Sequence, residues 1–197
     1  MNLLTEKINH LEIYLASKSP RRHELLKNII PNFEIVNKEI EEIFPDDLPS
    51  DEIAQYLAEL KAKAYQKESN KNNLFITADT IVVLNDKVLG KPKNFKDAFS
   101  MLRELSCNTH TVYTGVALLH NKKIHSFQDS TKVTFYELKN EEIEFYINKH
   151  QPYDKAGSYG IQEWMGYVGI KKMEGDFFNV MGFPLHKVYR ELNKLFI

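Results

Sequence analysis

The chain has 197 residues, 43% of them hydrophobic, and its 26 lysines and arginines nearly balance its 27 aspartates and glutamates. A chain of this length can bury a substantial core, and it suits one domain or two closely associated lobes. The formal net charge of -1 provides no overall basic field, which argues against binding to nucleic acid or to an anionic membrane. Any site for an anion must therefore be local.

The cysteine and histidine content argues against disulfide-linked and zinc-binding proteins. The single cysteine, Cys107, excludes an intrachain disulfide framework and a multi-cysteine metal site. The histidines lack the paired spacing typical of zinc sites, so no structural zinc is expected. The first residues are charged and contain no long apolar run, so we expect neither a signal peptide nor a membrane span. These features predict a soluble, cytoplasmic protein.

The first expected element is a strand over residues 13–16 that leads through a polar corner into a helix. Ser19 is a suitable N-cap residue, and Pro20 suits the first helical position. Leu25 and Leu26 supply an apolar helix face. The stretch is therefore predicted to be a strand–loop–helix unit.

The charges at this corner are unusual. Arg21 and Arg22 fall in the first helical turn, where the helix dipole disfavours each cation by about 0.3–1 kcal/mol. The hydroxyls of Ser17 and Ser19, together with free backbone N–H groups, complete a set that can bind phosphate. The alternative is that both arginines simply extend into solvent, and this stretch taken alone favours that alternative.

The remaining elements are predicted from the spacing of apolar residues. The expected strands cover residues 33–36, 74–78, 81–84, 88–89, 109–119, 124–127, 132–136 and 167–170. The expected helices cover residues 53–64, capped by Ser50 or Asp51, and residues 94–105, 140–149 and 184–195. Strands and helices alternate with hairpins as well as crossovers, which predicts an α/β or α+β fold with a mixed sheet.

Asp79 is the strongest candidate for a catalytic residue. It stands between two strongly apolar runs, where a carboxylate is costly unless it has partners or faces a cleft. Such a group could bind a divalent cation or accept a proton from water. The alternative is an aspartate that caps a turn at the end of a strand.

Several further polar residues, taken together, indicate the kind of chemistry that the chain could perform. Lys91 lies between Gly90 and Pro92, which would hold its ammonium group in a defined place. Carboxylates, cations and hydroxyls form a set that suits metal-assisted chemistry on a polyphosphate. The set comprises Glu41, Glu42, Asp79, Arg21, Arg22, Lys61, Lys91, Ser17, Ser19 and Thr80. Neither a GxxxxGK[ST] loop nor a GxGxxG fingerprint is present, so an ATPase or a dehydrogenase is not supported.

The sequence resembles the Maf family in motifs that follow one another along nearly the whole chain. They are LASKSPRR at 15–22, ADTIV at 78–82, GKP at 90–92, THTVYTGV at 109–116, YDKAGSYGIQ at 153–162 and EGDFFNVMGFPL at 174–185. The resemblance implies a single Maf-like pyrophosphatase domain over residues 1–197. Its fold would be shared with inosine triphosphatases: a mixed twisted sheet flanked by helices, with a central cleft between two lobes.

The resemblance also implies a nucleoside triphosphate pyrophosphatase that releases a nucleoside monophosphate and pyrophosphate. The GIQ ending of one motif and the loop at Glu174 and Gly175 resemble the branch that hydrolyses dTTP and UTP more than the 7-methyl-GTP branch. The alternatives are that second branch, or a nucleotide-binding regulator of cell division and septum formation without significant turnover. Nucleic-acid binding through the arginine corner is disfavoured by the near-neutral charge.

The family's roles can be carried over by position. Asp79 matches the general base or metal-binding aspartate. The phosphate-facing lysines are matched by Lys61 and Lys91, and the phosphate corner by Ser17, Arg21 and Arg22. Base choice is linked to the positions of Arg21, Thr80 and Gln162.

One departure concerns the metal. The family's Asp-Glu pair after the second strand appears here as Glu41-Glu42. Which carboxylate holds the metal therefore stays open, and we favour Glu42. The hypothesis is that Mg²⁺ or Mn²⁺ is held by Glu42, Asp79 and the substrate phosphates, while Asp79 activates a water for attack at the α-phosphorus. The expected partner is a nucleoside triphosphate, with no nucleic acid and no membrane, and a homodimer is compatible with the sequence.

Overall fold

The computed structural model describes residues 3–196 in two compact units. The first contains described residues 3–79, 114–129 and 182–196, and the second contains residues 80–113 and 130–181. Three strands have residues in both units: β3 (Asn73–Leu84), β5 (Thr109–His120) and β6 (Lys123–Phe135). The remaining elements each belong to a single unit.

The sheet contains both parallel and antiparallel strand pairs. Its strand order is β2-β1-β3-β5-β6-β7, with β4 paired to β3. β1 (Glu12–Ala16) pairs in parallel with β2 (Glu34–Val36) and with β3. β4 (Lys87–Leu89) pairs antiparallel with β3, and β7 (Ile170–Glu174) pairs antiparallel with β6. The predicted mixed α/β fold is therefore confirmed.

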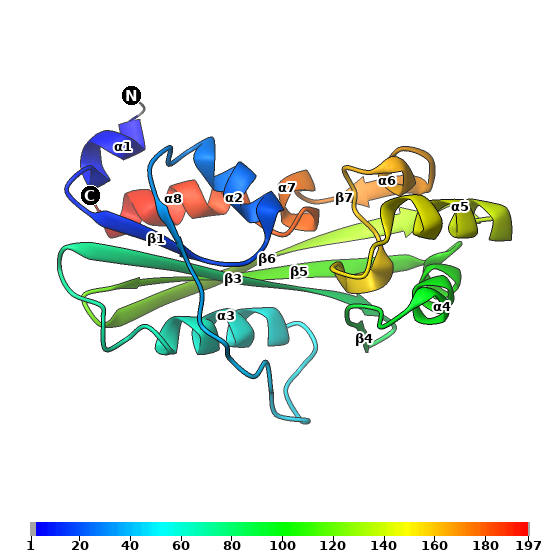
Figure 1. Ribbon diagram of the computed structural model, residues 1–197, viewed down its shortest axis with the longest axis horizontal. Helices are drawn as coiled ribbons and strands as arrows, with labels where there is room; N and C mark the ends of the chain where they lie inside the picture. The colour runs from blue at the N-terminus through cyan, green and yellow to red at the C-terminus, as the bar shows by residue number, and fades with distance from the viewer. Residues whose placement is uncertain (1–2, 197) are drawn as a thin grey trace. The chain divides into compact units, whose positions relative to one another are not determined.

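In the first unit, helices cover both faces of the strands. α3 (Ile53–Lys63) lies on one face, and α1 (Leu3–Ile8), α2 (Pro20–Lys27) and α8 (Leu185–Leu195) lie on the other (Figure 1). α3 packs closely against the sheet because the Thr77 hydroxyl donates to the Ala58 carbonyl at 2.6 Å. At Gly115, a Cβ would lie only 2.3 Å from the Ala54 carbonyl oxygen, so this approach of β5 to α3 requires glycine.

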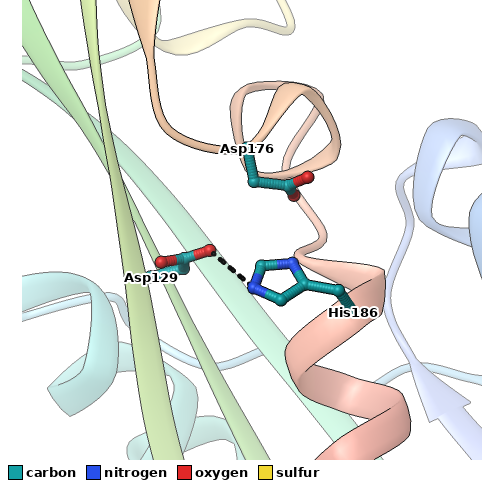
Figure 2. Close-up of side chains that lie close together, drawn as sticks. All are labelled: Asp129, Asp176 and His186. Carbon is teal, nitrogen blue, oxygen red and sulfur yellow. Dashed lines mark ion pairs between the residues drawn. The ribbon is translucent and has the colours of Figure 1, made fainter.

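Polar side chains at the start of α8 contact Asp129 of β6. Lys187 lies in the first turn of α8, where the helix dipole disfavours a cation, and His186 precedes it in the same turn. The Asp129 carboxylate lies 2.7 Å from Lys187 Nζ. It also lies 3.6 Å from His186 Nε2 (Figure 2). Asp129 therefore compensates the positive end of the helix. Asp176, also drawn in Figure 2, belongs to the second unit, where it caps the short helix α7 (Phe177–Val180).

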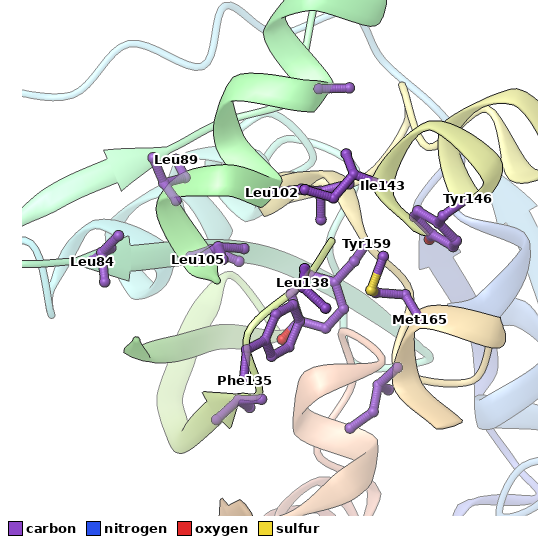
Figure 3. Packing of buried hydrophobic residues seen from close by; sticks show 14 of the residues in the cluster. Leu84, Leu89, Leu102, Leu105, Phe135, Leu138, Ile143, Tyr146, Tyr159 and Met165 are labelled. Atoms are coloured by element: carbon purple, nitrogen blue, oxygen red, sulfur yellow. The ribbon is translucent and has the colours of Figure 1, made fainter. Parts of the chain in front are cut away.

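The second unit has its own apolar core. α4 (Phe95–Leu105) is capped by Asn94, whose side chain accepts from the Asp97 N–H at 3.0 Å. α5 (Asn140–His150) ends at Gln151 in the left-handed conformation. The core joins side chains of these helices to those of the strands, including Leu102, Phe135 and Tyr146 (Figure 3). The unit is completed by η1 (Ala156–Ser158) and α6 (Trp164–Val168).

Several boundaries differ from the predictions. The strand predicted over residues 167–170 is wrong: residues 164–168 form α6, and β7 begins at Ile170. The N-cap of α3 is Glu52 rather than Ser50 or Asp51. The strand predicted to be interrupted at Asp79 is continuous, and the two strands predicted over residues 124–136 are one strand, β6. Short apolar runs do not distinguish helix from strand, and polar residues can continue a strand when neighbouring strands pair with it.

None of the helices within residues 3–196 combines the length and the apolar character needed to cross a bilayer.

His110 should make the free energy of unfolding depend on pH. The side chain is 1% exposed, its Nε2 lies 2.7 Å from the Tyr159 hydroxyl, and burial lowers its pKa to about 4. Because the unfolded state binds the proton near pH 6.5, the stabilisation is complete above pH 6.5 and is lost as pH falls toward 4. The loss should amount to about 3 kcal/mol. Urea unfolding across this range should show a shallower pH slope in His110→Gln, whereas substituting the exposed His10 by Gln should leave the slope unchanged.

Candidate active site

The corner after β1 is built around Ser17 in the first unit. Parallel pairing sets Ala16, the last residue of β1, beside Thr77 of β3, so Ser17 leaves the sheet at the point where β3 continues into Ala78 and Asp79. Ser17 is 6% exposed, and its hydroxyl accepts the Ser19 N–H at 3.2 Å. Ser19 is the N-cap of α2 and Pro20 its first residue, as predicted, although Ser19 makes no side-chain cap hydrogen bond.

Arg22 does not simply extend into solvent. Its Nε donates to the Gly182 carbonyl at 2.8 Å, and its Nη1 donates to the Ala78 carbonyl at 3.0 Å. Burial lowers the pKa of the guanidinium, and the charge of Asp79 opposes that effect. Two backbone carbonyls thus hold the guanidinium in one orientation, and Nη1 also lies 3.5 Å from the Ser17 hydroxyl. Arg21 is half-buried in the same turn of the helix.

Asp79 is paired inside the first unit. It is 9% exposed, and its carboxylate accepts a hydrogen bond from the Lys61 ammonium of α3. The same ammonium lies 2.7 Å from Glu42 Oε1 in the loop before α3. Lys61 is therefore more than a complement to the dipole of its helix, since it bridges two carboxylates that lie far apart in the sequence.

This arrangement has the composition of a site for a hard divalent cation. Glu42 and Asp79 both reach one positive charge, and carboxylate oxygens are the ligands that Mg²⁺ and Mn²⁺ prefer. Glu42 is partly exposed, with 47% of its side chain accessible, whereas the Lys61 side chain is only 16% accessible. The Glu42 carboxylate is thus open to solvent, whereas the Asp79 side chain is only 12% accessible. The residues present therefore fit a cation that is shared with a ligand entering from water.

The other predicted site residues lie in the second unit. Thr80 follows Asp79 on β3 and is half-buried, and Lys91 is exposed in the loop after β4. Gln162 lies between η1 and α6. The Gly157 N–H donates to the Gly90 carbonyl at 3.1 Å, which joins the loop of Lys91 to the segment that leads to Gln162. The structure thus links two motifs that lie about 60 residues apart in the sequence.

A charged cluster in this unit was missed by the sequence reasoning. Lys155, 8% exposed, lies 3.1 Å from Glu163 Oε1, and the Tyr146 hydroxyl donates to the other oxygen of that carboxylate. The available signal was the lysine inside the YDKAGSYGIQ motif, opposite in charge to the glutamate that follows the motif. Periodicity could not reveal this pairing, because Tyr146 comes from a separate helix.

Comparison with known proteins gives a consistent match over the chain. Residues 12–195 match the family model described as Maf-like protein. A dTTP/UTP pyrophosphatase of Flavobacterium johnsoniae is 48% identical over 193 residues, covering 98% of this chain and 100% of the relative. A dTTP/UTP pyrophosphatase of Cytophaga hutchinsonii is 50% identical over 192 residues, covering 96% of this chain and 88% of the relative.

A solved structure shares the fold. The Staphylococcus aureus Ham1 protein superposes with a TM-score of 0.55 at 15% sequence identity. The match covers 93% of this chain and 99% of the Ham1 chain. At this identity the likeness concerns the fold alone, and it agrees with the mixed sheet flanked by helices.

Proposed function

This chain belongs to the Maf family, and from that membership we propose that it hydrolyses dTTP and UTP to the nucleoside monophosphate and pyrophosphate. The observation that carries the proposal is the pairing of Asp79 and Glu42 with one ammonium beside the arginine corner. A pyrophosphatase needs a shielded carboxylate, cations for the phosphates and ligands for a metal, and the first unit contains all three. The dTTP/UTP specificity of the relatives supports the choice of substrate.

In the proposed reaction, Asp79 accepts the proton of the water that attacks the α-phosphorus. Asp79 is only 9% exposed, so its electrostatic interactions with nearby charges are screened less by water than those of a surface carboxylate. A Mg²⁺ or Mn²⁺ ion held by Glu42 and Asp79 would reduce the charge repulsion between the triphosphate and an incoming nucleophile. The α–β phosphoanhydride bond breaks, and pyrophosphate carries away the bonding electron pair.

The cations have separate proposed roles. Arg22, oriented by the Ala78 and Gly182 carbonyls, supplies positive charge for the phosphates, and Ser17 supplies a hydroxyl beside it. Lys61 and Lys91 stabilise charge on the transferred group and on the leaving pyrophosphate. The roles proposed for Arg21, Thr80 and Gln162 in base choice rest on the family resemblance.

For Gln162, the structure adds one supporting observation. Its side-chain Oε1 is buried and has no hydrogen-bond partner among residues 3–196. Uracil and thymine present one N–H donor between two carbonyl acceptors, and an amide oxygen can accept that donor. A buried acceptor without a partner costs about 1–3 kcal/mol, which a bound base would recover.

The domain extent, location, partners and oligomeric state of the protein are proposals as well. We propose that residues 1–197 act as one pyrophosphatase domain, because the family match spans both units. From composition and charge we keep a cytoplasmic location, the absence of nucleic-acid and membrane partners, and a homodimer as proposals. Gel filtration with light scattering would measure the oligomeric state.

A panel of nucleoside triphosphates, assayed by pyrophosphate release with Mg²⁺, with Mn²⁺ and with EDTA, tests the proposed function. We expect dTTP and UTP to be turned over fastest and EDTA to abolish turnover, because the two carboxylates provide the cation site. A strong preference for 7-methyl-GTP would contradict the choice of substrate. Tight metal-dependent binding without pyrophosphate release would favour a nucleotide-sensing regulator instead.

A further inference from the structure

The segment that carries Gln162 is closed by a buried ion pair in the second unit. Lys155 lies at its start and Glu163 at its end, and the two side chains are 3.1 Å apart. Lys155 also lies 2.8 Å from Asp154 Oδ1. An ammonium that is 8% exposed requires such partners, so the pair draws the two ends of the segment together.

Tyr146 of α5 fixes the middle of the same segment. Its hydroxyl accepts the Gly160 N–H at 2.9 Å and donates to Glu163 Oε2. Burial of the fully enclosed ring raises the pKa of the Tyr146 phenol, and the hydrogen bond to Glu163 raises it further. The hydroxyl therefore keeps its proton and can serve both partners at once.

Gly160 shows how tightly this arrangement is packed. A Cβ at this position would lie 2.8 Å from Glu163 Cδ, so the carboxylate rests directly on the glycine backbone. The segment is thus held by an ion pair, by a bridging hydroxyl and by close packing. Gln162 stands between the two contacted residues, Gly160 and Glu163.

Gln162 is restrained on its other side as well. Its backbone carbonyl accepts the Tyr167 hydroxyl at 2.7 Å, whereas its Oε1 is buried and unpartnered within the described part of the chain. The backbone on both sides of the Gln162 side chain is therefore fixed, and its buried oxygen is an acceptor without a partner in that part of the chain. An amide that could turn freely would present either its oxygen or its NH₂ group.

We infer that Tyr146, Lys155 and Glu163 are positioning residues that hold Gln162 so that its oxygen meets the N3–H of uracil or thymine. Cytosine carries an unprotonated N3 acceptor at the same place, so two acceptors would oppose each other and cytosine would be rejected. This inference rests on the proposed function, because it concerns the base of that substrate. The discrimination between uracil or thymine and cytosine would then depend on residues that do not touch the base.

Tyr146→Phe tests the inference by removing only the bridging hydroxyl. The probes are α,β-imido-dUTP and α,β-imido-dCTP with Mg²⁺, whose affinities are measured by calorimetry, since they report base choice whether or not the chain hydrolyses its substrate. We expect the wild type to favour the dUTP analogue and the variant to lose at least about tenfold of that preference. Tyr65→Phe is the matched control: Tyr65 is a buried tyrosine of the first unit, 3% exposed, that stacks on Phe75.

The outcomes separate a positioning role from a merely structural one. A lower melting temperature with an unchanged preference would overturn the inference, and so would equal affinity for both probes in the wild type. If Tyr146→Phe does not fold, Glu163→Gln is judged by the same ratio, because it keeps the side-chain volume and removes the charge opposite Lys155. A wild-type preference for the dUTP analogue that falls in Tyr146→Phe, found together with no hydrolysis of dTTP by the wild type, would contradict the proposed function and leave the positioning role supported.

Discussion

Asp79→Asn should lower kcat for dTTP by about 10²–10⁴-fold, the usual contribution of a positioned general base. The amide is nearly the same size as the carboxylate, so the continuous strand β3 and its neighbours should be preserved. It cannot accept the proton of the attacking water, and it leaves Lys61 paired with the Glu42 carboxylate. Initial rates of pyrophosphate release, measured beside thermal unfolding, would show whether activity is lost while the fold is kept.

Asp86→Asn is the matched control for this variant. Asp86 lies in the turn between β3 and β4 with φ of 62°, a conformation that asparagine also adopts readily. We expect unchanged turnover in this variant. Turnover at the wild-type level in Asp79→Asn would contradict the role of Asp79 as general base.

Glu42→Gln should raise the Mg²⁺ concentration needed for half-maximal activity by at least about tenfold, equivalent to about 1.4 kcal/mol of metal binding. A neutral amide remains an oxygen ligand but no longer balances the charge of the cation. Activity measured as a function of Mg²⁺ at saturating dTTP gives this concentration directly. The maximum rate at high Mg²⁺ should fall much less than in Asp79→Asn, because the proton acceptor remains.

The adjacent Glu41 provides the control for this second variant. Both residues are exposed glutamates, and Glu42 is paired with Lys61 at 2.7 Å. Glu41→Gln should therefore leave the Mg²⁺ dependence unchanged. The reverse result, with the shift in Glu41→Gln alone, would transfer the proposed metal role to Glu41.

Much of the fold followed from local patterns. The strand of β1, Pro20 at the start of α2, Asn94 at the start of α4 and the turn after β3 were predicted near their observed positions. Each depends on residues close together in the sequence, where capping and turn chemistry operate. The prediction of a strand over residues 167–170 was wrong because such a short stretch carries too few residues to define a period.

The candidate site residues were chosen from the sequence, but their pairings could not be predicted from it. Asp79 was singled out because a charge between apolar runs needs a partner, and the structure supplies that partner as Lys61. Lys61 itself had an ordinary local explanation as a lysine near a helix end. Arg22 was expected to need an anion, yet two backbone carbonyls already orient it.

The sequence by itself determined the element types, the family resemblance and the supply of acids, cations and hydroxyls, because these depend on residue identity and short-range spacing. Only the tertiary structure decided that Lys61 bridges Glu42 and Asp79, and that Tyr146 joins Gly160 to Glu163. Coulombic pairing and hydrogen bonding act over a few ångströms in space, whatever the separation along the chain. Chain folding brings these groups together, and no local period records which of them will meet.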